Sequence, residues 1–177
     1  MRSESDGLAP SADLQIAVID LSSLPWTCGT FSDDLSSPAI TISEATGPTQ
    51  PFRYCLRNIG SQTVNVTVQV EELDDLEIGC TGDENIYDTT CGSGQGELGE
   101  VVRASYQVME CDFSTSSPSV TAVLRDQLVT PVSLGTLGHG RARCYFADAF
   151  ISYQNEVQRQ QIQSDRLTWR FAWTGQV

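Results

Sequence analysis

Oxygen-bearing side chains are concentrated between Cys80 and Cys91, where they could bind a metal ion. Four of them carry carboxylate or amide groups: Asp83, Glu84, Asn85 and Asp88. Asp74, Asp75 and Glu77 precede this segment and could contribute further oxygen atoms. Calcium takes about 6–8 oxygen ligands, and the segment lacks the regular ligand spacing of an EF-hand. Two interpretations stay open: a disulfide-closed surface loop, which is favoured, and a calcium site. No other cofactor is predicted.

The cysteines indicate an oxidising compartment. There are six of them: Cys28, Cys55, Cys80, Cys91, Cys111 and Cys144. Their number is even, none of them forms a CxxC pair, and the chain has a single histidine, so a zinc site explains them poorly. Disulfides explain the pattern better, and we therefore expect a protein that is secreted into an oxidising environment.

The sequence leaves the disulfide pairing open, because six cysteines can be connected in many ways. A Cys80–Cys91 bridge would close a loop of about 12 residues and stabilise the fold by roughly 3 kcal/mol. Cys55 and Cys144 each lie in a candidate strand, so a bridge between them could join two strands. That pairing would leave Cys28 to bond with Cys111.

Groups suited to catalysis are scarce. The only histidine, His139, lies between two glycines in a turn-like setting, and the chain has no HExxH, GxSxG or phosphate-binding glycine motif. The neighbouring carboxylates Asp33 and Asp34, like Asp74 and Asp75, would point to opposite sides of an extended chain. We therefore predict that the protein is not an enzyme.

The charge of the chain is strongly negative. Its net charge is −13, and all ten cationic residues are arginine. This charge repels phosphate backbones and anionic lipids, so neither nucleic acid nor a membrane surface is an expected partner. No apolar run approaches the roughly 20 residues that span a bilayer. Residues 1–6 are polar, which together with the cysteines favours an export signal that has been removed.

Alternating side chains predict β-strands. Valine occupies every second position between residues 63 and 71, which puts four valines on one face of a strand. The same alternation recurs in residues 102–108 and 167–173. A first strand, which is also the predicted assembly strand, begins with Leu14, Ile16 and Val18.

Weaker strands are predicted at residues 39–43, 52–57, 119–128 and 143–153, separated by turn residues. About eight such strands imply an all-β fold: an antiparallel two-sheet β-sandwich of jelly-roll type with disulfide-stapled loops. Residues 155–164 are predicted to form at most a short surface helix.

The domain organisation is simple. We predict an N-terminal arm over residues 1–12, interpreted as the remnant of a donor or assembly segment, and a single jelly-roll β-sandwich domain over residues 13–177.

Aromatic side chains offer a second binding chemistry, because exposed rings can stack on sugars. The alternation of Trp169, Phe171 and Trp173 places them on one face, and burial in the core is favoured for that face. Trp26 is the better candidate for an exposed ring, and its alternative role is a plug over the sandwich end.

Several motifs resemble the TasA/camelysin-like family of exported bacterial and archaeal proteins with SipW-type signal peptides. They span nearly the whole chain and lie at residues 12–16 (ADLQI), 54–61 (YCLRNIGS), 79–84 (GCTGDE), 90–92 (TCG), 96–98 (GEL) and 163–169 (QSDRLTW). The resemblance implies a jelly-roll sandwich, export, and a structural role in biofilm matrix or surface fibres. Fibre-forming members of the family polymerise by β-strand addition from an N-terminal arm. The arm of this chain is short, polar and without an alternating apolar set.

The predicted function is a secreted, non-catalytic structural subunit of extracellular matrix or surface fibres, with copies of itself and matrix polysaccharide as the candidate partners. The alternative is a monomeric secreted module that binds a glycan or calcium at the cell surface. A hydrolase is ranked last.

Overall fold

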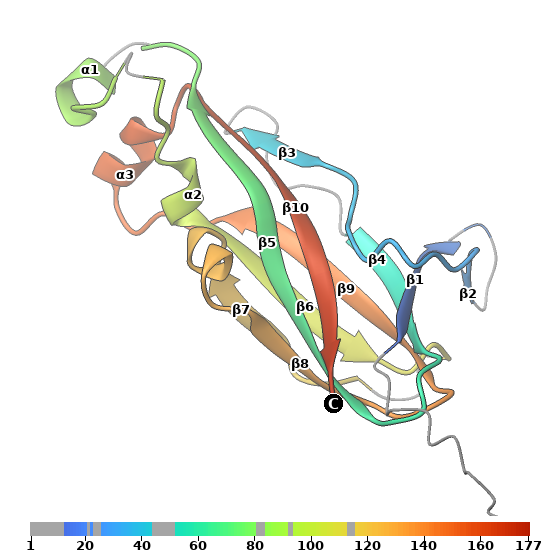
Figure 1. Ribbon diagram of the computed structural model, residues 1–177. Helices are drawn as coiled ribbons and strands as arrows, with labels where there is room; N and C mark the ends of the chain where they lie inside the picture. Colours follow the sequence, from blue (N-terminus) through green and yellow to red (C-terminus); the bar gives the residue numbers. More distant parts are fainter. Residues whose placement is uncertain are drawn as a thin grey trace, which may run out of the picture.

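The computed structural model describes residues 13–20, 22, 26–43, 52–80, 84–91, 94–112 and 116–177. The predicted N-terminal arm, residues 1–12, lies outside this part of the chain. The described residues form two antiparallel β-sheets that pack face to face (Figure 1). This architecture confirms the predicted all-β sandwich.

The strands alternate between the two sheets at most connections. The first sheet has the order β2-β1-β4-β9-β6-β7. It consists of β1 (Leu14–Asp20), β2 (Thr27–Cys28), β4 (Phe52–Asn58), β6 (Val102–Met109), β7 (Val120–Val123) and β9 (Ala142–Ile151). The second sheet has the order β3-β10-β5-β8 and consists of β3 (Ile40–Ser43), β5 (Val64–Glu77), β8 (Val132–Leu137) and β10 (Asp165–Gln176).

The central strands bury the side chains that the alternation predicts. In β5 the four valines at positions 64, 66, 68 and 70 are at most 2% exposed, while the residues between them are exposed or half-buried. The aromatic residues of β10 are equally buried, so Trp169, Phe171 and Trp173 belong to the core and do not form a sugar platform. β6 repeats the pattern with Val102, Ala104 and Tyr106.

Polar atoms of the aromatic core are mostly paired. The indole N–H of Trp173 donates to the Tyr54 hydroxyl at 2.6 Å, and the Tyr54 and Tyr145 rings stack at 5.4 Å. The Tyr106 hydroxyl donates to Gln127 at 2.5 Å. Burial raises the pKa of Tyr54 well above its ordinary value, so this hydroxyl stays protonated and neutral within the core.

The weaker predicted strands are present with shifted ends, and two strands were missed: β8 and the two-residue β2. β7 stops at Val123, and the rest of its predicted range forms a 3-10 helix, η2 (Arg125–Leu128). β8 was not predicted, because its sequence VSLGTL has only weak alternation.

Three short helices gather at one end of the sandwich, opposite the C-terminus (Figure 1). They are α1 (Glu84–Tyr87), α2 (Leu98–Val101) and α3 (Glu156–Gln161). Asn155 caps α3 by accepting a hydrogen bond from the Gln158 N–H, so the predicted surface helix is present. None of the helices in the described residues is long and apolar enough to cross a membrane.

A second, smaller apolar cluster covers the outer face of the first sheet. Ala17 and Ile19 of β1 point into it, together with the disulfides Cys28–Cys55 and Cys111–Cys144. The third disulfide, Cys80–Cys91, closes the loop that contains α1, as the sequence suggested.

The suggested bridge between Cys55 and Cys144 is wrong, as is the remaining pair it implied. The two residues lie opposite one another on β4 and β9, and their sulfur atoms are 3.6 Å apart. Each sulfur instead bonds to a cysteine from a chain segment that crosses the outer face of the sheet: Cys28 of β2 for Cys55, and Cys111 after β6 for Cys144. Sequence alone does not show that these segments approach.

Candidate functional site

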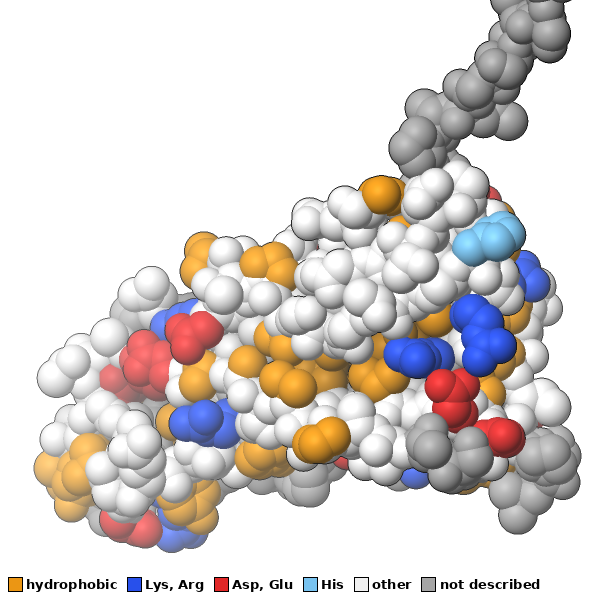
Figure 2. Space-filling model, turned by 90° about the horizontal axis from the view of Figure 1, so that it is seen from below, with side chains coloured by type: hydrophobic (Ala, Val, Ile, Leu, Met, Phe, Trp, Pro, Cys, Tyr) orange, Lys and Arg blue, Asp and Glu red, His pale blue; other side chains and the backbone are white. Residues whose placement is uncertain are grey.

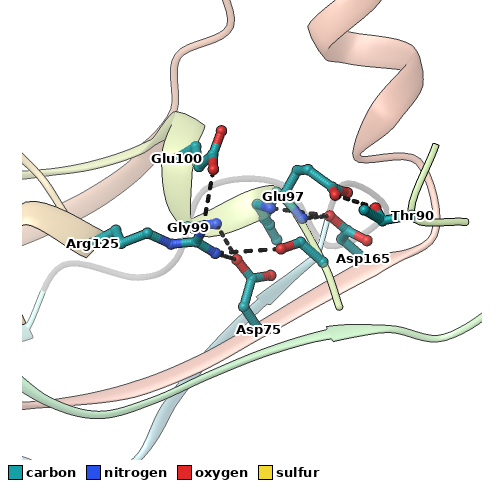
Figure 3. Close-up of polar contacts among 9 residues, drawn as sticks. Asp75, Thr90, Glu97, Gly99, Glu100, Arg125 and Asp165 are labelled. Carbon is teal, nitrogen blue, oxygen red and sulfur yellow. Dashed lines mark hydrogen bonds and ion pairs between the residues drawn. The ribbon is translucent and has the colours of Figure 1, made fainter. Parts of the chain in front are cut away.

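Five acidic residues from separate segments converge at the end of the sandwich that carries α1 and α2. We call them the acidic cluster: Asp75 and Glu77 of β5, Asp88 after α1, Glu97 before α2, and Asp165 at the start of β10. Figure 3 shows Asp75, Glu97 and Asp165 facing one another, with Arg125 on one side and Thr90 on the other.

A β-bulge turns the acids of β5 inward. Glu72 has a positive φ of 53°, and the register with β10 shifts between Thr168 and Arg170. One extra residue on β5 exchanges the two faces of the strand, because side chains alternate with a period of two. Beyond the bulge, Asp75 therefore faces inward with its side chain only 6% exposed, while Asp74 is exposed.

Asp75 is the member of the cluster with a cationic partner. Its Oδ2 accepts hydrogen bonds from the Gly99 N–H at 2.7 Å and from the Arg125 guanidinium at 2.5 Å. Arg125 also pairs with Glu100 at 3.0 Å. Its positive charge is therefore already shared between two carboxylates.

Asp165 is held by backbone donors. Its Oδ2 accepts from the N–H groups of Glu97 at 2.6 Å and Leu98 at 3.0 Å, and the residue is 1% exposed. Gly96 lies directly against it, since a Cβ at that position would be 3.0 Å from Asp165 Oδ1 and 2.5 Å from Asp75 Oδ1. A side chain at position 96 would collide with both oxygen atoms.

Single hydroxyl groups connect the other acids. Thr90 Oγ1 lies within hydrogen-bond distance of both Asp88 and Glu97, and it has one proton to donate. Ser164 Oγ likewise faces Glu77 and Glu84. Each hydroxyl can satisfy only one of its carboxylates at a time.

Within the described part of the chain, every member of the cluster keeps one buried oxygen atom without a hydrogen-bond partner. These atoms are Asp75 Oδ1, Glu77 Oε2, Asp88 Oδ2, Glu97 Oε2 and Asp165 Oδ1. Burial of a charged group without a partner is costly, and the group responds by shifting its pKa. Burial, with the charges of Asp75, Glu77 and Glu97 added to it, raises the pKa of Asp165 to about 7. Burial also raises the pKa of Glu97 and of Asp75.

An open cavity of about 610 Å³ lies beside the cluster and connects it to solvent. Gly96, Glu97, Asp75 and Arg125 are among the residues that line it. Small solutes therefore have a route to Asp75 and Glu97, the two members of the cluster that line the cavity.

The structure places the four predicted calcium ligands in different surroundings. Asp83 lies outside the described residues, and Asn85 is exposed. Glu84 is fully buried and accepts hydrogen bonds from Ser164, next to the cluster. Asp88 is 5% exposed and belongs to the cluster itself.

The sequence analysis missed Glu97 and Asp165 as site residues. Glu97 lies within the motif GEL and Asp165 within QSD, and both motifs entered the sequence analysis only through the family resemblance. The two residues meet through the hydrogen bond from the Glu97 N–H to Asp165 Oδ2, across 68 residues of chain, which no local pattern reveals.

The outer face of the first sheet holds a second group of potential ligands. We call Cys28, Cys55, Cys111 and Cys144 the sulfur cluster, because their sulfur atoms all lie within 4.8 Å of one another. All four are disulfide-bonded, so none offers a thiolate.

Trp26 and the predicted assembly strand lie on the same side of the molecule as the sulfur cluster. Trp26 is half-buried, 6.0 Å from the Phe146 ring and 4.9 Å from the Arg53 guanidinium, which agrees with a covering role. Leu14 and Ile16 are buried between the sheets, while Val18 is 60% exposed.

Comparison of the chain with protein-family models, with curated proteins and with solved structures gave no match.

Proposed function

We propose that this protein is a non-catalytic structural subunit of an extracellular matrix or of cell-surface fibres, and that neighbouring subunits join by β-strand addition. The observation that carries the proposal is an open side of the sandwich bordered by two edge strands. β7 ends the first sheet and β8 ends the second, and neither has an outer strand partner among the described residues. η2, which connects them, packs against both β5 and β7, so the two edges lie on the same side.

Edge strands present backbone N–H and C=O groups that can pair with a strand from another molecule. β7 and β8 lie along the lower border of the view in Figure 1. The view from below in Figure 2 shows hydrophobic side chains along the middle of this face, with charged side chains towards both ends. Val120 of β7 is 44% exposed and Val129 after η2 is 84% exposed. A strand from a second copy would cover such side chains while it completes the sheet.

The disulfides and the scarcity of catalytic groups support this proposal. Three disulfides suit a protein that persists in an oxidising compartment outside the cytoplasm. The single histidine, His139, donates a hydrogen bond from Nδ1 to the Gly60 carbonyl at 2.5 Å in a turn, where it serves the local structure.

Electron microscopy of the concentrated protein tests the proposal, and ordered filaments are expected. Val120→Lys puts a charge on the β7 edge, which blocks strand addition, and should abolish the filaments. Val157→Lys is the matched control, because Val157 lies on α3 and is similarly exposed at 46%. Circular dichroism checks that both variants fold. Monomers alone from the unaltered protein, or filaments that survive Val120→Lys, would contradict strand addition at this edge.

A further inference from the structure

The acidic cluster carries more negative charge than its protein partners compensate. Arg125 pairs with Asp75 and Glu100. Within the described residues, the other four members of the cluster form no ion pair. They are Glu77, Asp88, Glu97 and Asp165. Four carboxylates therefore face one another without a cation.

The oxygen atoms that lack a partner are also shielded from water. Asp165 is 1% exposed and Asp88 is 5% exposed, yet Asp165 Oδ1 and Asp88 Oδ2 have no hydrogen-bond donor among the residues that the structure describes. Buried polar atoms in folded proteins are nearly always paired, so each such atom needs an explanation. Several in one place, all acceptors and all on carboxylates, indicate a missing positive ligand.

Three of these residues have the separation that one ion requires. Glu77, Glu97 and Asp165 each offer an oxygen atom, and these atoms lie within 4.8 Å of one another. Calcium binds oxygen at about 2.3–2.6 Å, so two of its ligands can be at most about 5 Å apart. An ion placed between the three carboxylates would reach all of them.

Each carboxylate is already oriented through its other oxygen atom. Asp165 Oδ2 is held by two backbone N–H groups, and Glu77 Oε1 by the Gly79 N–H at 3.1 Å and by Ser164. Glu97 Oε1 contacts the Thr90 hydroxyl. Hydrogen bonds from the protein thus hold one oxygen atom of each carboxylate, and the other has no donor among the described residues. Metal ligands are commonly oriented by such hydrogen bonds.

We propose that Glu77, Glu97 and Asp165 bind a calcium ion, with Asp88 as a further ligand at the edge of the site. Oxygen donors select a hard cation, and the single sulfur near Glu77 and Asp88, that of Cys91, is bonded to Cys80. The ligands come from three separate segments and not from a compact octahedral cage, which suits calcium better than magnesium. The ion would tie the Cys80–Cys91 loop to β5 and β10.

The affinity for calcium alone, measured by titration calorimetry on the EDTA-treated protein, tests this site. Saturating calcium should also raise the melting temperature by about 5–10 °C, as expected for a ligand at about 100 times its Kd. Magnesium at the same concentration is the comparison. Equal affinity for magnesium would overturn the assignment to calcium, and the absence of binding at millimolar calcium would overturn the site.

Two substitutions locate the ion. Asp165→Asn keeps an oxygen acceptor for the Glu97 and Leu98 N–H groups, so the variant should fold and yet lose calcium affinity at least tenfold. Glu77→Gln should do the same through an independent segment. Asp148→Asn is the matched control, because Asp148 is an exposed carboxylate of β9. Calcium binding that survives both substitutions would place the ion elsewhere and refute the proposal.

Discussion

The sulfur cluster and the acidic cluster differ in how completely the protein itself pairs their side chains. Each brings together four or more side chains from distant segments of the chain. The sulfur cluster is complete within the protein, because two covalent bonds satisfy all four of its members. The acidic cluster is incomplete, because each of its members keeps a buried oxygen atom to which no described residue donates a hydrogen bond. The first region therefore stabilises the fold by itself, whereas the second costs stability until a cation binds.

The largest expected effect comes from removing one disulfide of the sulfur cluster. Replacing Cys28 and Cys55 with alanine should lower the free energy of unfolding by about 4 kcal/mol. The bridge spans 27 residues, for which the loss of chain restriction contributes about 3.5 kcal/mol, and the buried Cys55 side chain adds to it. Urea denaturation measures the change.

Cys80→Ala with Cys91→Ala provides the control for that experiment. This bridge spans 11 residues at the exposed loop, so its removal should cost less, about 3 kcal/mol or below. If removal of the Cys80–Cys91 disulfide lowered the free energy of unfolding equally or more, the disulfide of the sulfur cluster would not be the more stabilising of the two.

The next largest effect is a gain in stability, and it concerns the acidic cluster. In EDTA at pH 8, Asp165→Asn should stabilise the protein by about 2 kcal/mol, because it removes a buried charge but keeps the acceptor oxygen. The pKa of about 7 against about 3.9 for the unfolded chain sets a limit near 4 kcal/mol, and local relaxation reduces the gain. Thermal or urea unfolding gives the difference between variant and parent.

The pH dependence of that difference follows from the sign of the shift. A raised pKa in the folded state means that the protonated carboxyl favours folding below about pH 4, and that this contribution is lost as the pH rises to about 7. The advantage of Asp165→Asn should therefore be small at pH 4 and reach its full value above pH 7. A constant advantage across this range would show that ionisation of Asp165 is not its cause.

The smallest expected effect tests whether Arg125 compensates only part of the negative charge of the acidic cluster. Arg125→Gln should cost about 1 kcal/mol, because the guanidinium is 38% exposed and its pairs are partly screened by water. Double substitution with Asp75→Asn should recover most of this loss, since the pair is removed together. A loss that the second substitution does not recover would assign Arg125 a packing role instead.

The sequence by itself determined the sandwich. Period-two runs of valine and aromatic residues specify which face of β5, β6 and β10 is buried, because side chains alternate along any strand regardless of its partners. The same alternation correctly predicted that Asp74 and Asp75 point to opposite sides of the strand. It did not predict that Asp75 is the buried one, because the bulge at Glu72 exchanges the faces.

Only the tertiary structure decided the disulfide partners and the membership of the acidic cluster. Cys28 reaches Cys55 across the face of a sheet, and Asp165 meets Glu97 across 68 residues of chain. Such contacts follow from strand order and register, which result from the packing of the whole core and leave no mark on neighbouring residues. A site whose chemistry depends on those contacts is therefore visible only in the folded chain.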